Sequence, residues 1–256
     1  MKRLTVFLYG LITYLFFLGV FLYAIGFVGN IAVPKTIDSG VNGSVLFSLV
    51  INALLLSLFA IQHTIMARPA FKAIISKFIP RAAERSTFVL ATNLAFVLLF
   101  IQWRPLSGVV WQVDNAFGIM ILQALFWGGW GIVLVSTFMI DHFDLFGLRQ
   151  VVFYLMKKEY RPPRFQELAF YKFIRHPIML GFIIAFWATP HMSVGHLFFS
   201  IMTSGYILVG IAFEERDLTK HHGETYLRYA HRVPMLIPFL KPKHSGGDPE
   251  PQLEEK

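Results

Sequence analysis

Five stretches of this chain contain no aspartate, glutamate, lysine or arginine, and each is rich in apolar residues. A bilayer core about 30 Å thick is crossed by about 20 apolar residues in a helix. Only 15% of the residues are charged, whereas soluble domains average about 25%. The chain is therefore predicted to be an integral membrane protein. The stretches cover residues 4–34, 39–67, 86–103, 115–140 and 178–213.

The fifth stretch, 178–213, is too long for one helix. It is interrupted by Thr-Pro-His at 189–191 and by Ser-Val-Gly at 193–195, which favour a turn. We therefore expect two short helices that form a hairpin. The predicted fold class is an all-α integral membrane protein with about five to six transmembrane helices, the last two being this hairpin.

The distribution of charge predicts the orientation of the helices. With the amino terminus inside and six segments, 21 of the 23 lysines and arginines fall on the inner side, and only Lys35 and Arg104 fall outside. Cytoplasmic loops carry such an excess of basic residues. Both termini are therefore expected in the cytoplasm, and the net charge of +8 requires no nucleic acid partner. The absence of cysteine excludes disulfides, thiolate metal sites and cysteine nucleophiles.

The expected hairpin brings two polar segments together at the inner membrane surface. Its entrance is IRHP (174–177) and its exit is FEERDL (213–218). Pro177 suits the first turn of a helix, whose N-terminus favours an anion, and Arg175 adds a fixed positive charge. Glu214 and Glu215 supply acceptors for a cation or for hydroxyl groups. A ligand that carries both a carboxylate and a positive charge would match this combination.

Each of these residues also has a simpler explanation. Arg175 could anchor the chain among lipid headgroups, His176 could be an ordinary residue near a helix start, and the glutamates could be solvated just beyond a span. The functional interpretation depends on all of them occurring together.

The carboxyl-terminal part of the chain resembles the isoprenylcysteine carboxyl methyltransferase superfamily. The resemblance covers about residues 170–241 and rests on RHP followed by glycine, on the glutamate pair, and on the pattern G-E-x-Y-x-x-Y-x-x-R-V-P followed by IPF. The matching residues occur in the family order and at the family spacings. They are Tyr171, Arg175, His176, Pro177, Gly181, Glu214, Glu215, Gly223, Glu224, Tyr226, Tyr229, Arg232, Val233, Pro234 and Pro238.

This resemblance implies S-adenosylmethionine as cofactor, bound by the last helices and a cytoplasmic carboxyl-terminal segment. The zwitterionic amino acid part and the sulfonium of that molecule agree with the charges described above. No glycine-rich dinucleotide-binding pattern occurs. The cofactor-binding residues that the resemblance implies are Phe165, Gln166, Tyr171, Arg175, His176, Pro177, Ile178, Met179 and Glu214, with Glu215, Tyr226 and Arg232 as supports.

Two departures from the superfamily pattern bear on the methyl acceptor. Met179 stands where the pattern has a tyrosine, and Gly210 stands where the prenylcysteine enzymes have a substrate-binding arginine. We therefore expect an acceptor that is small or uncharged rather than a prenylcysteine carboxylate.

The remaining segments resemble the bacterial methanethiol S-methyltransferases, which convert methanethiol to dimethyl sulfide. The similarity lies in residues 23–38, 61–72 and 141–155. It implies a small thiol as substrate and a place in the bacterial inner membrane.

Methylation of a thiol requires the thiolate, and an alkyl thiol with a pKa of about 8.5 or above is mostly protonated at neutral pH. A base or a positive field is therefore expected. The candidates are His63, which lies within an apolar stretch, His142, which a neighbouring carboxylate of Asp141 or Asp144 would orient, and Arg149. No metal site is expected, since the adjacent His221 and His222 would point apart on a helix.

The predicted organisation has three parts: amino-terminal transmembrane helices over 1–140, a methyltransferase module over 141–243 and a disordered tail over 244–256. Two alternative functions stay open from the sequence. One is methylation of a lipid or of a prenylcysteine-like carboxylate, and the other is a non-catalytic membrane accessory role in nitrogen-oxide respiration. The oligomeric state is left open.

Overall fold

The computed structural model describes residues 2–41, 43–162, 167–238 and 240. Within these residues, five helices are long and apolar enough to cross a membrane. Four of them match the first four charge-free stretches, and the prediction of a helical membrane protein is confirmed. The five are α1 (Lys2–Gly29), α2 (Val45–Ala67), α4 (Glu84–Gln102), α5 (Ala116–Ile140) and α9 (Val194–His222).

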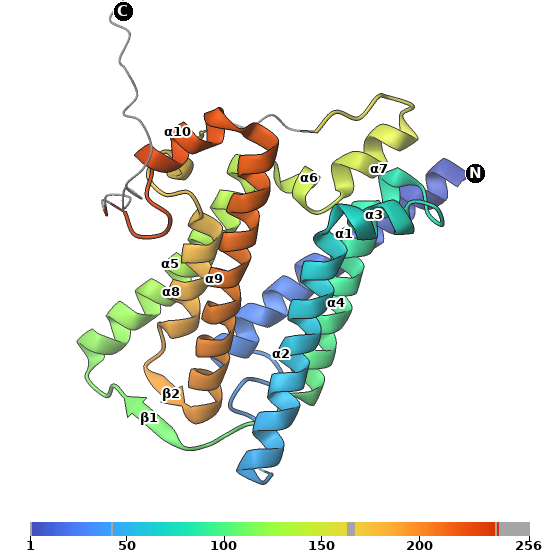
Figure 1. Cartoon of the computed structure of the whole chain (residues 1–256). Coiled ribbons are helices and arrows are strands. Elements are labelled where there is room, and N and C mark those ends of the chain that lie inside the picture. The colour runs from blue at the N-terminus through green and yellow to red at the C-terminus, as the bar shows by residue number, and fades with distance from the viewer. Residues whose placement is uncertain (1, 42, 163–166, 239, 241–256) are drawn as a thin grey trace, which may run out of the picture.

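Shorter elements lie at the two ends of this bundle. Figure 1 shows the amino terminus, α3, α6, α7 and α10 at one end, and the two strands at the other. The basic segments of the chain are therefore gathered at the end that carries α3, α7 and α10. These elements are α3 (Pro69–Ile75), η1 (Arg81–Ala83), α6 (His142–Leu145), α7 (Leu148–Leu155), η2 (Ala169–Lys172), α8 (Pro177–Trp187), α10 (Glu224–Arg232), β1 (Val109–Gln112) and β2 (His191–Ser193).

The fifth stretch divides where the sequence analysis expected, but not into two short helices. Helix α8 has 11 residues, whereas α9 has 29 and continues past the charge-free stretch as far as His222. Charged residues such as glutamate and lysine sustain a helix once it has left the hydrocarbon region. The helix ends at Gly223, whose φ of 54° suits a residue without Cβ.

The segment between α8 and α9 contains a strand that the sequence analysis did not predict. Strand β2 pairs with β1 in an antiparallel manner, with Val109 opposite Ser193 and Gln112 opposite His191. This pairing ties the turn between α8 and α9 to the connection between α4 and α5. Two strands this short have little periodicity to read from a sequence.

The main buried cluster lies toward the end that carries the strands. It is built from the last turns of α1, α4 and α8, the middle of α2 and of α5, and the second turn of α9. The opposite half of the bundle, toward α10, contributes few residues to it. Among its members are Phe27, Leu99, Trp103, Phe126, Phe186 and Phe199.

Helix α8 packs mainly against α5, and two glycines allow this contact. A Cβ atom on Gly181 would lie 2.7 Å from the carbonyl oxygen of Gly129, and a Cβ on Gly129 would lie 2.7 Å from the carbonyl oxygen of Gly181. Neither position has room for a side chain because the two backbones are in contact. The glycine pair therefore sets the position of α8, and with it the position of the residues at its start.

Candidate active site

The two polar segments at the ends of the α8–α9 pair meet in one cluster of charges. His176 Nε2 lies 3.0 Å from Glu215 Oε1, and His176 Nδ1 lies 3.5 Å from Glu214 Oε2. Arg175 Nη2 lies 3.0 Å from the same Glu215 oxygen. Residues that are almost 40 positions apart in the chain are thus in direct contact. The predicted proximity of the IRHP and FEERDL segments is observed.

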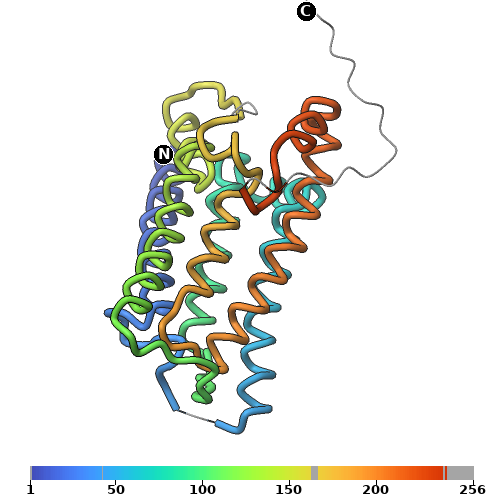
Figure 2. Tube along the Cα trace, turned by 90° about the vertical axis from the view of Figure 1, so that its left-hand side faces the viewer, coloured from blue at the N-terminus to red at the C-terminus, as the bar shows by residue number. Residues whose placement is uncertain are grey.

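The chain that follows α10 holds the arginine and the histidine in place. The backbone N–H of Arg175 donates to the carbonyl of Pro234 (2.9 Å), and that of His176 donates to the carbonyl of Met235 (3.2 Å). The Arg175 side chain also donates to the carbonyl of Ala230 in α10 (3.1 Å). Figure 2 shows α10 at the same end of the bundle as the start of α8. The carboxyl-terminal segment is therefore part of the site.

Three tyrosines border the charged cluster. Tyr226 and Tyr229 are buried with Val233 on one side of α10, and the Tyr229 hydroxyl donates to the carbonyl of Tyr171 (2.7 Å). Burial raises the pKa of Tyr229 to about 12 and also raises the pKa of Tyr171 and of Tyr226. All three hydroxyls therefore stay protonated at neutral pH. The three side chains are uncharged aromatic rings with a polar hydroxyl at one edge. Tyr229 matched the superfamily pattern but was not selected as a site residue, because the pattern does not show which tyrosine reaches back to Tyr171.

The electrostatics of the cluster favour a charged histidine. Burial lowers the pKa of His176, but the hydrogen bonds and negative charges of Glu214 and Glu215 outweigh burial, so the net shift is upward. The side chain of Glu214 is 47% exposed, whereas that of His176 is 4% exposed. The buried Nε–H of Arg175 has no hydrogen-bond partner among the described residues. In this cluster the carboxylate of Glu214 is accessible, and the Nε–H of Arg175 is a cationic donor without a partner among the described residues.

The remaining predicted cofactor residues lie at different places relative to this cluster. Pro177 is the first residue of α8 and His176 is its N-cap, as predicted. Ile178 and Met179 follow in the first turn and are half-buried. Arg232 lies at the end of α10 and forms an ion pair with Glu167 rather than with the cluster. Phe165 and Gln166 lie outside the described residues.

An apolar hollow of about 190 Å³ lies between α5, η2 and the start of α8. One of its lining residues, Ile174, directly precedes Arg175 in the chain. Apolar residues scattered over three elements give no signal in a sequence, so this hollow was not predicted. Its lining residues are Ile132, Phe170, Phe173, Ile174, Leu180 and Pro238.

Of the three predicted catalytic residues, His63 lies within α2 and faces α4. Its Nδ1 is 3.5 Å from the hydroxyl of Thr92, a weak contact, and its Nε2 forms no hydrogen bond within the described part of the chain. The rings of Phe59 and Phe88 flank the imidazole, with centroids 5.3 Å and 4.8 Å away. His63 is therefore a half-buried histidine with one ring nitrogen available.

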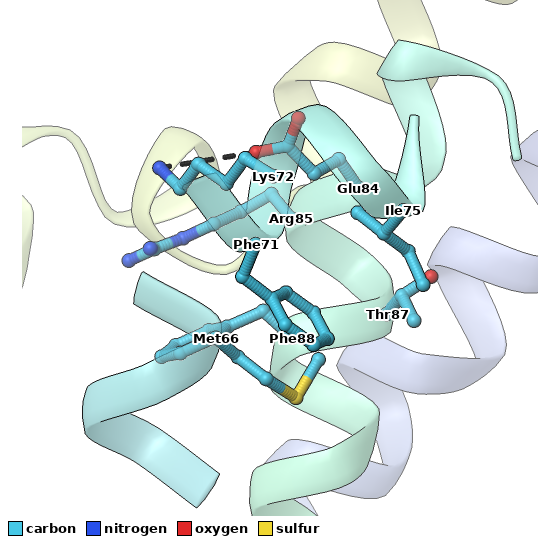
Figure 3. Close-up of a pocket in the computed structure, with 8 residues that line it drawn as sticks. All are labelled: Met66, Phe71, Lys72, Ile75, Glu84, Arg85, Thr87 and Phe88. Carbon is cyan, nitrogen blue, oxygen red and sulfur yellow. Dashed lines mark ion pairs between the residues drawn. The ribbon is translucent and has the colours of Figure 1, made fainter. Parts of the chain in front are cut away.

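A small pocket lies between α2, α3 and α4 (Figure 3). One of its lining residues, Phe88, also packs against the His63 ring, and an ion pair of 3.8 Å between Lys72 and Glu84 links α3 to the start of α4. Its volume of about 10 Å³ is close to the minimum for a single water molecule. This pocket is too small for a nucleoside cofactor. Its lining residues are Met66, Phe71, Lys72, Ile75, Glu84, Arg85, Thr87 and Phe88.

His142 lies in a different place, between α1 and α5, and its partners are hydroxyl groups. Its Nδ1 is 2.8 Å from Thr137 Oγ1, which itself donates to a backbone carbonyl, so the histidine donates here. Its Nε2 then accepts from the hydroxyl of Tyr14 (2.9 Å). Burial lowers the pKa of His142 despite the opposing charge of Asp141. The expected carboxylate-oriented histidine is therefore a neutral imidazole with both nitrogens occupied.

Arg149 lies in α7 and holds the turn that follows α5. It forms an ion pair with Asp141 and lies over the ring of Phe153, 5.5 Å from its centroid. Within the described residues it makes no contact with the Arg175–His176 cluster. The structure thus brings most of the predicted cofactor residues together but separates the three predicted catalytic residues.

The sequence is 50% identical to the methanethiol S-methyltransferase of Crocosphaera subtropica over 243 residues, which cover 95% of each chain. It is 49% identical to the methanethiol S-methyltransferase of Mycobacterium tuberculosis over 239 residues, which cover 93% of this chain and 98% of that one. The chain belongs to the methanethiol S-methyltransferase family. The family predicted from the sequence patterns is therefore confirmed.

A more distant similarity extends outside the methanethiol S-methyltransferases. Nurim of Rattus norvegicus is 25% identical over 185 residues, which cover 68% of this chain and 70% of that one. No family model matches the sequence, and no solved structure matches it.

The pKa of His176 leads to a prediction about stability. A group whose pKa is raised by folding stabilises the folded state fully below its ordinary pKa of about 6.5, and this contribution declines as the pH rises through the raised value. We expect His176→Gln to lower the midpoint of thermal unfolding in detergent strongly at mildly acidic pH and less at alkaline pH. His221→Gln, on the exposed end of α9, is the control and should show no such trend. If the gap between the unfolding midpoints of the wild type and His176→Gln grew with pH, the upward shift of the His176 pKa would be contradicted.

Proposed function

We propose that this chain is an S-adenosylmethionine-dependent methyltransferase of the bacterial inner membrane that converts methanethiol to dimethyl sulfide. In this proposal both termini lie in the cytoplasm and residues 141–243 form the methyltransferase module. The observation that supports it most directly is the contact between His176 and the glutamates of α9, in a chain about half identical to named methanethiol S-methyltransferases. Family membership favours this role over lipid methylation and over a non-catalytic accessory role.

The residues of the charged cluster fit a zwitterionic sulfonium ligand. The half-exposed carboxylate of Glu214 is available to the ligand's positive groups, and the unused Nε–H of Arg175 is available to its carboxylate. The ring of Tyr171 adds an aromatic surface, which attracts cations. In our proposal the uncharged nucleoside part contacts the apolar hollow beside Phe170 and Leu180. Phe165 and Gln166 remain proposed contacts from the superfamily resemblance.

The positioning of the reactants is the main contribution that this chain can make to methyl transfer. When bound, S-adenosylmethionine supplies a methyl group on a positively charged sulfur. The residues of the site would hold the thiol close to the bound cofactor in a reactive orientation, and such positioning is worth about 7–11 kcal/mol in model reactions.

The proton of the thiol has to leave as the new carbon–sulfur bond forms. Of the predicted catalytic residues, we favour His63 as the acceptor of this proton, since its Nε2 has no partner among the described residues. His142 would first have to release the hydroxyl of Tyr14. In the same proposal Arg149 has a positioning role, because it holds the turn at Asp141 rather than the reacting atoms.

Gas analysis of cells that express the chain tests this function. Cells supplied with methanethiol should release dimethyl sulfide into the headspace, and cells with the empty vector should not. The purified protein should give the same product when S-adenosylmethionine is added. Intact cofactor binding without dimethyl sulfide would contradict the proposed acceptor, and labelled cofactor could then reveal a methylated lipid or prenylcysteine.

A further inference from the structure

After α10 the chain folds back onto the residues that begin α8. We call this segment, residues 233–238 and 240, the strap, and Figure 1 shows it in red where it turns back from α10. Two of its backbone carbonyls accept hydrogen bonds from the N–H groups of Arg175 and His176. Because the strap fixes these two residues, a force that holds the strap in place also holds the charged cluster.

The strap lies beside a part of α5 that is long and apolar enough to be within the membrane. Its residue Pro238 lines the apolar hollow together with Ile132 of α5 and Leu180 of α8. Ile132 lies eight residues before the end of α5, which corresponds to about 12 Å along the helix. The 25 residues of α5 extend over about 37 Å, so a bilayer core of about 30 Å includes Ile132. The strap therefore reaches the side of the bundle that faces lipid.

Large apolar side chains of the strap and its neighbourhood are exposed. Ile237 and Leu240 are 58% and 61% exposed, and Phe173, which lines the same hollow as Pro238, is 61% exposed. The N–H of Leu240 donates to the carbonyl of Ile237, so these two residues belong to one turn. Exposed apolar surface of this kind marks a site that contacts a partner or a membrane.

Basic residues flank these apolar side chains. Lys172 directly precedes Phe173, and Arg228 lies on α10 just before the strap; both are exposed. The inner leaflet of a membrane is negatively charged and attracts such residues, while apolar side chains enter the acyl region beneath the headgroups. The depth of Ile132, the exposed apolar side chains and the flanking positive charges all match the same partner, a lipid surface.

We propose that the strap is inserted into the inner leaflet of the membrane, and that this insertion holds the cofactor site together. The side chains of Phe173, Ile237 and Leu240 lie among the acyl chains, and the backbone of the strap holds Arg175 and His176 from the same position. The inference rests on the orientation given in the proposed function and is independent of the methyl acceptor. It places part of the carboxyl-terminal segment in the lipid, where the sequence analysis expected the cytoplasm.

The depth of the strap can be measured with single labels, because the chain contains no cysteine. Bimane on Ile237→Cys, in nanodiscs that hold one copy of the full chain, should be quenched by nitroxide-labelled lipid and protected from iodide. Leu125→Cys, on an exposed part of α5, is the lipid reference, and Glu159→Cys, whose side chain is 75% exposed beyond α7, is the water reference. A label at 237 that behaves like the label at 159 would overturn the insertion.

The double variant Ile237→Ser with Leu240→Ser tests the link between insertion and the site. In the same nanodiscs its affinity for S-adenosylmethionine should fall by about tenfold, because two apolar side chains no longer hold the strap in the lipid. Ile237→Leu should bind as the wild type does. The matched control is Val45→Ser with Leu46→Ser, which changes two exposed apolar residues at the start of α2, away from the site. It should leave the affinity unchanged.

The possible outcomes separate this inference from the proposed function. Wild-type cofactor affinity in the double serine variant would overturn the role of insertion in holding the site. Methylation of a lipid in place of a thiol would overturn the proposed acceptor, while the depth of the label at 237 would still decide whether the strap lies in the membrane.

Discussion

Replacement of Glu214 by alanine is expected to lower the affinity for S-adenosylmethionine by about 100-fold, because a charge-assisted contact contributes about 1.5–3 kcal/mol. The side chain of Glu214 is half exposed, and its contact with His176 is 3.5 Å long. Little folding stability should therefore depend on it. The loss should appear as weaker binding and not as unfolding.

Titration calorimetry of the purified protein in detergent measures this effect directly. Asp114→Ala is a suitable control, because Asp114 is an exposed carboxylate just after β1, at the opposite end of the bundle from the charged cluster. The control should bind as the wild type does. Unchanged cofactor affinity in Glu214→Ala, with the melting temperature also unchanged, would refute the assignment of Glu214.

Replacement of Arg175 by methionine should have the second large effect, on both folding and binding. The side chain of Arg175 is 11% exposed and is shared between Glu215 and the carbonyl of Ala230. Removing one partner of a buried ion pair destabilises a protein by about 3–5 kcal/mol. A quarter of the Glu215 side chain is still exposed, so we expect about 3 kcal/mol, the lower end of that range.

The double variant Arg175→Met with Glu215→Gln separates the effect of losing Arg175 on folding stability from its effect on cofactor binding. Removing the glutamate charge as well should restore part of the unfolding free energy, since no uncompensated carboxylate is left. Cofactor binding should stay lost, because the cationic donor is still missing. Strictly additive losses of stability would show that the two side chains do not interact as the structure indicates.

The long helices and the meeting of His176 with Glu214 could both be predicted from sequence. Charge-free stretches reveal spans because the bilayer excludes charged side chains. A turn at 189–195 then brings the start of α8 and the second half of α9 together at one end of the bundle. These inferences needed only chain length and polarity, and the described structure agrees with the long helices and with the contact.

The contacts between distant helices could not be predicted in the same way. His142 was expected to pair with a neighbouring aspartate, but hydroxyls from α1 and α5 reach its nitrogens. The full length of α9 was missed because its last turns are polar and lie beyond the apolar stretch.

Photochemical cross-linking of labelled S-adenosylmethionine to the purified protein tests the central claim most directly. Peptide mapping should place the label within residues 165–180 or 210–235, and an excess of S-adenosylhomocysteine should prevent it. Label concentrated in residues 141–155, or spread over the chain despite the competitor, would contradict a cofactor site between the start of α8 and the end of α9.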